Sequence, residues 1–188
     1  PSRIKSSSAK IDAKSISTRP CFLCEKNRPK EQLEISWRDY VLLVNPYPIF
    51  PQHFTIPHKT HKIQEILPHF SDMLDLAMLL PDFVVFYNGP KSGASAPDHF
   101  HFQAGTKNFL PLIGQRSTVE KKEIQSSVFL WKNYLRSVVE VVNPCKNEVI
   151  DIFREIYAKL QTDNAEPMMN VVAFYENECW HVLVLPRK

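Results

Sequence analysis

Apolar residues return along this chain with two periods, and each period predicts a different kind of element. Between residues 63 and 80 they recur every three or four positions, which is the spacing of one face of a helix. Pro68 lies inside this stretch and should kink the helix or delay its start. Residues 148–160 carry the same apolar spacing, which predicts a second, amphipathic helix.

Shorter runs of β-branched and apolar residues, bounded by turn residues, predict strands. One or two strands are expected within residues 128–142, and residues 171–175 and 180–185 predict a closing hairpin. The other predicted strands cover residues 40–44, 53–56, 83–87 and 99–103. This order of elements predicts an α+β fold with a mainly antiparallel sheet.

The two ends of the chain differ from this pattern. Residues 1–20 are rich in serine and lysine without a sustained period, which predicts a basic extended arm ahead of one domain over residues 21–188. The chain begins with Pro1 rather than methionine and nearly ends in the apolar run Val182–Leu185, which suggests a piece of a longer chain. A sheet edge left unpaired at Leu185 would offer a surface for a homodimer.

Composition and charge exclude several classes of protein. With 44% hydrophobic and 23% charged residues, the 188-residue chain is not a disordered one. Its longest apolar runs have about five residues, whereas a membrane-spanning helix needs about 20. The net charge is +6 over residues 1–30 and −3 over residues 31–188, a balance that favours an anionic ligand over a nucleic-acid surface. Four cysteines are too few for a disulfide scaffold, so we expect a cytoplasmic protein. From the apolar runs and the charge balance we expect neither a membrane nor a nucleic acid as a partner.

Small residues and alternating polar residues meet in one segment. Three of the four glycines fall between residues 89 and 105, and small residues over 88–97 would let backbone N–H groups approach an anion closely. In a following strand, His99, His101 and Gln103 would share one face and two phenylalanines the other. A small-residue loop leading into two exposed imidazoles indicates a site for phosphate chemistry. The alternation taken alone favours a half-buried strand with incidental histidines.

Residues 88–103 resemble the active-site segment of the histidine triad superfamily, in its transferase branch. That branch includes galactose-1-phosphate uridylyltransferase and the dinucleoside tetraphosphate and GDP-sugar phosphorylases. Its pattern of Asn, Gly-x-Ser and His-x-His-x-Gln is matched by Asn88, Gly93–Ser95 and His99–Gln103, and the Cys-x-x-Cys of the uridylyltransferase by Cys21–Cys24. Residues 1–111 as a whole resemble an uncharacterised bacterial family of this branch. The resemblance implies a histidine-triad-like antiparallel sheet with packed helices.

The segment departs from the uridylyltransferase pattern in one respect. Asp98 adds a residue before His99, while the spacer between Asn88 and Gly93 is one residue shorter. The phosphate loop would then run in a different register, which leaves the roles of Ser95 and Asp98 open.

The resemblance implies catalytic roles for His101 and Gln103. A neutral His101 would attack the α-phosphorus of a nucleotide and form a nucleotidyl-histidine, with its second ring nitrogen bonded to a backbone carbonyl. Similar proteins with a third histidine in place of Gln103 mostly hydrolyse nucleotides, and those with glutamine are similar to transferases, since an amide cannot shuttle a proton. The residues expected to hold phosphate oxygens come from the loop and the strand: Asn88, Lys91, Gly93, Ser95 and Gln103.

The implied function is nucleotidyl transfer or phosphorolysis. The substrate would be a nucleoside diphosphate sugar or a dinucleoside polyphosphate, and the acceptor would be phosphate or a sugar phosphate. A nucleotide hydrolase of the same superfamily is the alternative among enzymes. A nucleotide-binding or zinc-stabilised module without turnover is the alternative outside them.

Cys21 and Cys24 are compatible with half of a zinc site, a redox pair or a structural turn. A redox pair would normally open a helix, whereas the sequence Glu25–Pro29 that follows favours a zinc knuckle. Structural zinc needs about four ligands. The resemblance supplies His99 and a histidine near the end of the second strand, either His61 or His58, of which we favour His61. A structural zinc ion is the expected cofactor, and an emptied site in a retained fold is the alternative.

The remaining histidines carry weaker expectations. His53 and His69 are expected at the surface or at a helix end, and His181 is expected to serve packing in the last strand.

Overall fold

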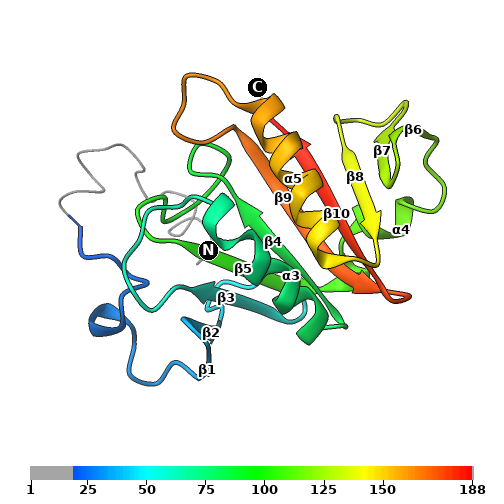
Figure 1. Ribbon diagram of the computed structural model, residues 1–188. Helices are drawn as coiled ribbons and strands as arrows, with labels where there is room; N and C mark the ends of the chain where they lie inside the picture. Colours follow the sequence, from blue (N-terminus) through cyan, green and yellow to red (C-terminus); the bar gives the residue numbers. More distant parts are fainter. Residues whose placement is uncertain (1–18, 188) are drawn as a thin grey trace.

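The computed structural model describes residues 19–187, within which ten strands form one antiparallel sheet (Figure 1). This architecture confirms the predicted α+β fold. The order across the sheet is β1-β2-β3-β5-β4-β9-β10-β8-β7-β6. Apart from Arg19 and Pro20, the predicted arm lies outside the described residues. The strands are β1 (Glu34–Trp37), β2 (Tyr40–Val44), β3 (His53–Pro57), β4 (Phe83–Asn88), β5 (His101–Thr106), β6 (Lys121–Gln125), β7 (Val128–Trp131), β8 (Val139–Asn143), β9 (Met169–Glu176) and β10 (Cys179–Pro186).

The first predicted helix begins later than the apolar period indicates. Residues 63–66 are not helical, Pro68 lies in a 3-10 turn, and the α-helix starts at Phe70. Proline suits a first helical turn because its missing N–H would have no partner there. The helices of the described part are α3 (Phe70–Leu79), α4 (Pro111–Gln115) and α5 (Lys146–Leu160), with 3-10 turns η1 (Glu25–Asn27), η2 (Leu67–His69) and η3 (Lys107–Phe109).

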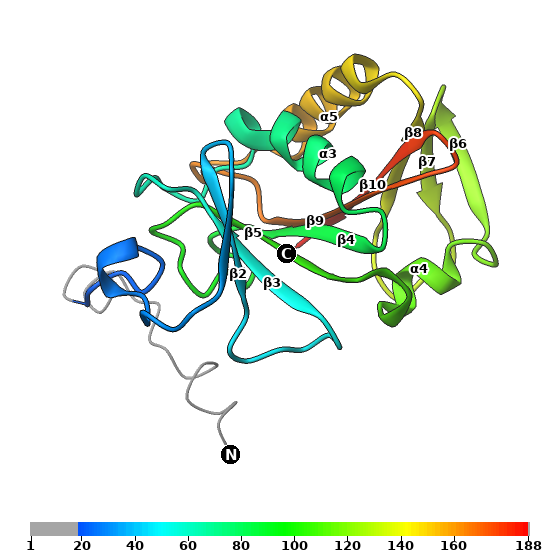
Figure 2. The ribbon, with the colours of Figure 1, turned by 90° about the horizontal axis from the view of Figure 1, so that it is seen from below.

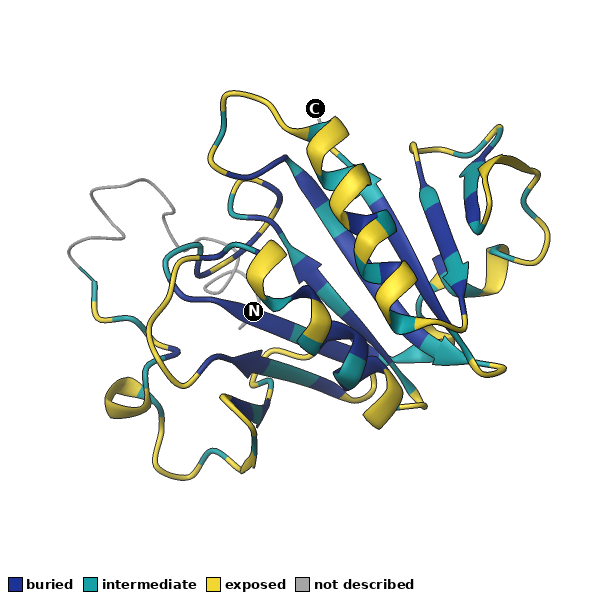
Figure 3. Cartoon of the chain, viewed as in Figure 1, coloured by how far each residue is buried: buried dark blue, intermediate teal, exposed yellow. Residues whose placement is uncertain are grey.

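The two longer helices, α3 and α5, lie side by side on one face of the sheet (Figure 2). Phe70 of α3 stacks on Phe153 of α5 with ring centroids 3.7 Å apart, and both are buried. Under them lie alternate residues of the central strands, including Phe102, Val171 and Val182. Burying one such side chain contributes roughly 1.5–3 kcal/mol. The outward turns of α5 stay exposed while the strands beneath are buried (Figure 3).

The opposite face of the sheet carries a second, smaller apolar cluster. Val84, Val172 and Leu183 pack there against Leu112 of α4 and against Trp131. These strand residues alternate with those under α3 and α5, as the period of two requires. α4 and Trp131 therefore cover part of the face opposite α3 and α5.

The predicted closing hairpin is present as β9 and β10, paired in register from Cys179↔Glu176 to Pro186↔Met169. β10 lies between β9 and β8, so it is an interior strand. β8 pairs with the outer side of β10 from Trp180 to Val184, so the free edge expected at Leu185 is reduced to the last residues of β10, which β8 does not reach. Within residues 19–187 the outer strands of the sheet are β1 and β6.

None of the helices in residues 19–187 combines the length and the apolar character that crossing a membrane requires.

Candidate functional site

The motif strand differs from its prediction at its start. β5 begins at His101, and His99 lies in the loop before it. His101 and Gln103 face away from α3 and α5, because Phe102 between them packs in the core beneath those helices. The expectation that both imidazoles are exposed is wrong, since His99 is 0% and His101 2% exposed.

Both imidazoles are buried because the segment 58–64 runs along the start of the motif strand. The N–H of His58 donates to the carbonyl of Phe100 over 2.9 Å, and the N–H of Phe100 donates to the carbonyl of Lys62. These bonds take the place of the regular strand pairing that was predicted for residues 99 and 100. The backbone of residues 58–64 therefore covers the first residues of the motif.

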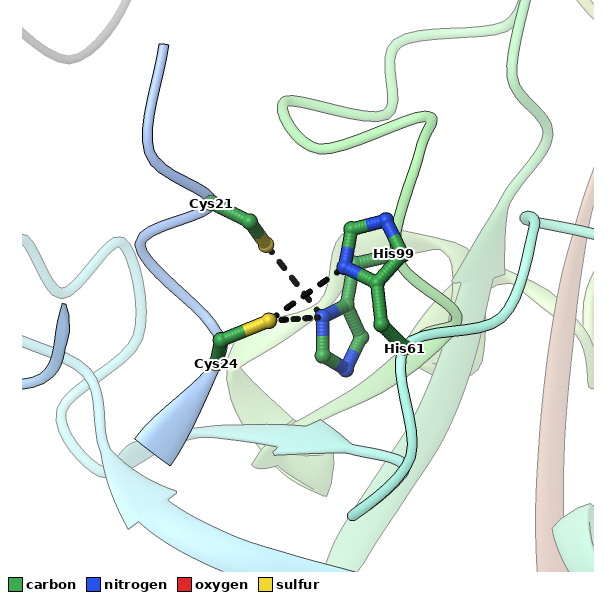
Figure 4. A group of neighbouring side chains, drawn as sticks. All are labelled: Cys21, Cys24, His61 and His99. Carbon is green, nitrogen blue, oxygen red and sulfur yellow. Dashed lines mark hydrogen bonds between the residues drawn. The ribbon is translucent and has the colours of Figure 1, made fainter. Parts of the chain in front are cut away.

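Four side chains from three separate parts of the chain meet beside this strand (Figure 4). The Sγ of Cys21 lies 3.2 Å from Nδ1 of His99, and the Sγ of Cys24 lies 3.3 Å from Nδ1 of His61 and 3.6 Å from Nδ1 of His99. All four ligand atoms lie within 4.8 Å of one another. The residues expected as metal ligands are thus brought together and positioned to hold a metal ion.

The distances in this cluster fit a tetrahedral ion with sulfur and nitrogen ligands. Zinc bonds of about 2.3 Å to sulfur and about 2.0–2.1 Å to nitrogen place such ligand atoms about 3.5 Å apart. Burial opposes ionisation of the Cys21 thiol, but its hydrogen bond with His99 and two backbone N–H groups lower its pKa below the usual value. The thiolate is the form that binds metal. The donor set is therefore compatible with zinc.

His99 is held in the tautomer that a metal ligand needs. Its Nε2 lies 2.7 Å from the carbonyl oxygen of His58 and donates a proton to it, which leaves Nδ1 free for the ion. The ring of His58 points elsewhere: its Nδ1 accepts the N–H of Thr60, and it packs edge-on against Tyr40. Of the two candidates that sequence left open, only His61 has its ring in the cluster.

Asp98, the inserted residue of the motif, lies at the rim of this cluster. Its Oδ2 is 3.9 Å from Nε2 of His61, and its Oδ1 accepts a hydrogen bond from Arg19 over 3.3 Å. Both residues line an open surface depression together with Cys21 and Cys24. Asp98 therefore lies beside His61 at a distance that is too long for a hydrogen bond.

His101 has one ring nitrogen engaged and one free of that bond. Nδ1 lies 2.9 Å from the carbonyl oxygen of His99, so it carries the proton and Nε2 carries the lone pair. Burial lowers the pKa of His101 to about 4, which keeps the ring neutral at neutral pH. A neutral imidazole with an unprotonated Nε2 is the form that can act as a nucleophile.

Gln64 holds the backbone of the motif strand, a role that its sequence position does not reveal. Its Oε1 accepts the N–H of His101 over 2.8 Å, and its Nε2 donates to the carbonyls of His101 and Asn88 over 3.0 and 3.1 Å. Gln64 is 1% exposed, so no water competes for these bonds. The side chain thus joins the end of β4 to the beginning of β5.

The expectation that His53 lies at the surface or at a helix end is wrong, because His53 is buried on β3. Its Nε2 lies 2.9 Å from Oε1 of Gln103 on the neighbouring strand β5. His69 does lie at a helix end, at the close of η2, and stacks on Phe100 with centroids 4.1 Å apart.

The small-residue loop after Asn88 is tied to β9. Asn170 donates from Nδ2 both to Oδ1 of Asn88 and to the carbonyl of Ser92, each over 2.7 Å. Gly93 has a φ of 100°, a conformation that favours glycine. Lys91, Gly93 and Ser95 are exposed, and the Lys91 ammonium bonds to Asn164. Among residues 19–187, no hydrogen bond links these loop side chains to His101 or Gln103.

The first part of the sequence matches a known family, and the fold matches solved structures. Residues 1–106 match the family described as a domain of unknown function, DUF4922. No curated protein matches the sequence.

Solved structures share the fold at low sequence identity. A DUF4931 family protein from Bacillus cereus is 17% identical with a TM-score of 0.56, over 81% of this chain and 84% of that one. Yeast Ap4A phosphorylase is 20% identical with a TM-score of 0.50, over 80% of this chain. The chain spans 56% of the yeast enzyme's length. These likenesses show a histidine-triad-like fold.

Proposed function

We propose that this chain, which belongs to the DUF4922 family, is a nucleotidyltransferase or phosphorylase that works through a nucleotidyl-histidine. Its substrate would be a nucleoside diphosphate sugar or a dinucleoside polyphosphate, and its acceptor phosphate or a sugar phosphate. The observation that carries this proposal is the bond from Nδ1 of His101 to the carbonyl of His99, which leaves Nε2 as a nucleophile. The fold shared with yeast Ap4A phosphorylase supports the choice of substrate class.

The proposed reaction has two displacement steps. Nε2 of His101 attacks the α-phosphorus, forms a P–N bond and breaks the P–O bond to the phosphate-bearing leaving group. The imidazole gains positive charge in this step, and the carbonyl of His99 stabilises it through the Nδ1 proton. An oxygen of the acceptor then attacks the same phosphorus, forms a P–O bond and breaks the P–N bond, which restores neutral His101. Splitting one displacement into two lowers each barrier.

The negative oxygens that develop at phosphorus need fixed donors. Asn88, Gln103, Lys91 and the backbone around Gly93–Ser95 are the proposed donors. Each well-placed donor is worth about 3 kcal/mol in a site that excludes water. Gln103 has a second effect in the proposal: its amide holds an oxygen but cannot deliver a proton, which favours transfer over hydrolysis.

A zinc ion held by Cys21, Cys24, His61 and His99 would be structural, because four protein ligands leave no open position for substrate. It would fix the segment around Cys21 to His99, whose backbone carbonyl accepts the hydrogen bond from Nδ1 of His101. Free cysteines are compatible with the cytoplasmic setting that we propose.

The proposal is tested by a turnover screen across nucleoside diphosphate sugars and dinucleoside polyphosphates, with and without inorganic phosphate. We expect phosphate-dependent release of nucleotide products, and a loss of at least about 10³-fold in kcat for His101→Ala. His69→Gln is the matched control: His69 stacks on Phe100 but belongs to neither the nucleophile nor the proposed donors, so its kcat should fall far less than that of His101→Ala.

Three results would contradict the proposal in different ways. Equal product release without phosphate would identify a hydrolase. Nucleotide binding without turnover would identify a binding module. Near-normal turnover by His101→Ala would rule out the covalent route.

A further inference from the structure

We infer that His53 is a positioning residue, which holds the side-chain amide of Gln103 with its nitrogen as the donor left for substrate. The inference rests on the proposed function and deepens it by assigning a residue that sets the polarity of the site. Nothing in the histidine motif itself points to His53, which lies 50 positions earlier in the chain.

The pairing of β3 with β5 brings the two side chains together. Thr55 lies opposite Gln103 and His53 lies opposite Gly105, so His53 and Gln103 are diagonal neighbours on the same face. Gly105 has no side chain to stand between them. The Nε2 of His53 and the Oε1 of Gln103 are 2.9 Å apart.

The direction of this hydrogen bond follows from the other ring nitrogen. The backbone N–H of Ile49 points at Nδ1 of His53 over 3.3 Å, so Nδ1 is an acceptor and carries no proton. The single proton of the neutral ring is then on Nε2, which donates to the amide oxygen of Gln103. Burial lowers the pKa of His53, which keeps the ring neutral.

Aromatic packing keeps the His53 ring in this orientation. The ring stacks on Phe86 with centroids 5.9 Å apart and meets Phe50 edge-on at 5.4 Å. Phe50 itself lies on Gly105, where an added Cβ would come within 2.4 Å of the phenyl ring. The glycine is thus needed for Phe50 to reach the sheet and support His53, which is 5% exposed.

The consequence concerns the sign of the charge that Gln103 presents. An amide has an acceptor end and a donor end, and His53 engages the acceptor end. Within residues 19–187 the Nε2 of Gln103 donates to no other residue, so its two protons are available to a ligand. A flipped amide would turn its oxygen toward a phosphoryl oxygen and repel it. His53 therefore selects the orientation that binds an anion.

A double-mutant cycle tests this role in the full chain. His53→Phe keeps an aromatic ring but removes the donor, and should lower kcat of a confirmed substrate about tenfold, the value of one net hydrogen bond. In a Gln103→Ala background the same change should have no further effect, because His53 acts only through Gln103. His53→Gln, whose amide N–H can replace Nε2–H, should restore most of the activity. Equal losses in both backgrounds would overturn the inference and leave a packing role.

A second measurement does not depend on turnover. In ¹⁵N spectra of the wild-type protein, His53 should be the neutral Nε2–H tautomer, and the side-chain NH₂ signals of Gln103 should broaden or shift in His53→Phe. An Nδ1–H tautomer would overturn the inference even if the protein is an active transferase. The expected tautomer in a protein without turnover would leave the positioning bond standing and reject the proposed function instead.

Discussion

At the scale of single residues, the candidate site is shaped by side chains that bind backbone atoms. His101 donates a hydrogen bond from Nδ1 to the carbonyl of His99, which leaves Nε2 unprotonated. Gln64 binds the N–H and the carbonyl of His101, and also the carbonyl of Asn88. The tautomer and the position of the same histidine are therefore fixed by two different groups.

Replacing Gln64 should measure how strongly this backbone clamp stabilises the protein. Gln64→Ala leaves one buried N–H and two carbonyls without their partner, and should lower the free energy of unfolding by about 3 kcal/mol. Urea denaturation measures the change. Gln32→Ala is the control, because Gln32 makes one exposed bond to the carbonyl of Val44 and should change stability by less than about 0.5 kcal/mol. Equal losses of unfolding free energy in the two variants would show that the bonds of Gln64 do not stabilise the fold.

Residue type and spacing revealed some of these groups and concealed others. The Cys pair and the alternation from His99 onward are visible because each depends on neighbours in the sequence. Gln64 and His53 bind partners that lie 24 to 50 positions away, so no local pattern marks them. The available signal was a polar residue beside buried apolar ones, such as Gln64 before Ile66.

At the scale of elements, the loop between α5 and β9 is joined to the segment before η2 by Glu166. Its Oε1 accepts the N–H of Ile66 over 2.9 Å, and its Oε2 lies 2.6 Å from the hydroxyl of Tyr87. That hydroxyl also lies 3.0 Å from the carbonyl of Gln64, but has only one proton to give. A protonated Glu166 can donate to Tyr87 and leave its proton for Gln64, so the neutral acid satisfies every partner.

This network should make stability depend on pH. Burial raises the pKa of Glu166 from 4.5 to about 7, so the folded chain binds a proton there that the unfolded chain has already lost. Its contribution is complete below pH 4.5 and is lost as pH rises through about 7. From pH 5 to pH 8, Glu166→Gln should therefore gain about 2 kcal/mol in unfolding free energy relative to wild type. Urea denaturation at each pH measures the difference.

The control for this pH series is Glu155→Gln, which changes an exposed glutamate of α5. Its stability relative to wild type, measured at the same pH values, gives the baseline for the Glu166→Gln series. A pH-independent difference for Glu166→Gln would show that Glu166 keeps an ordinary pKa in the fold.

Elements were predictable where one face is buried and the other is not. The strands over 40–44, 53–56 and 83–87 and the β9–β10 hairpin follow the apolar pattern closely. β1 and β6 were missed because they are the outer strands, and all five residues of β6 are exposed. The start of α3 was placed too early because Ile66 is buried in an irregular segment, which mimics a helical period.

At the scale of the whole molecule, the Cys–His cluster joins parts of the chain that are far apart in sequence. Cys21 meets His99 across 78 positions, and Cys24 meets His61 across 37. An ion at this point would restrain the segment from Cys21 to η1 against the motif loop. Such a restraint stabilises the folded state only, since the unfolded chain has no such site.

Zinc content and metal removal test this restraint. We expect about one zinc per chain, and chelation should lower the melting temperature by on the order of 10 °C. Cys21→Ser should reproduce that loss and abolish zinc binding. Cys145→Ser is the matched control, because Cys145 is exposed and outside the cluster. Full stability of Cys21→Ser, with no metal in the wild-type protein, would contradict the prediction.

The overall architecture was predictable further than the assembly of the sheet. The α+β class follows from the order of elements, whereas the interior position of β10 depends on β8, a strand 36 positions before it. Pairing over such separations is decided by the packing of the complete sheet.

Transfer through His101 is tested most directly by trapping the intermediate. Wild-type protein given a substrate but no acceptor should gain the mass of one nucleoside monophosphate, and peptide mapping should place it on His101. Added phosphate should remove the label and release a nucleoside diphosphate, and His101→Ala should acquire none. Turnover of the substrate without any labelled His101, or label that persists in His101→Ala, would contradict the account.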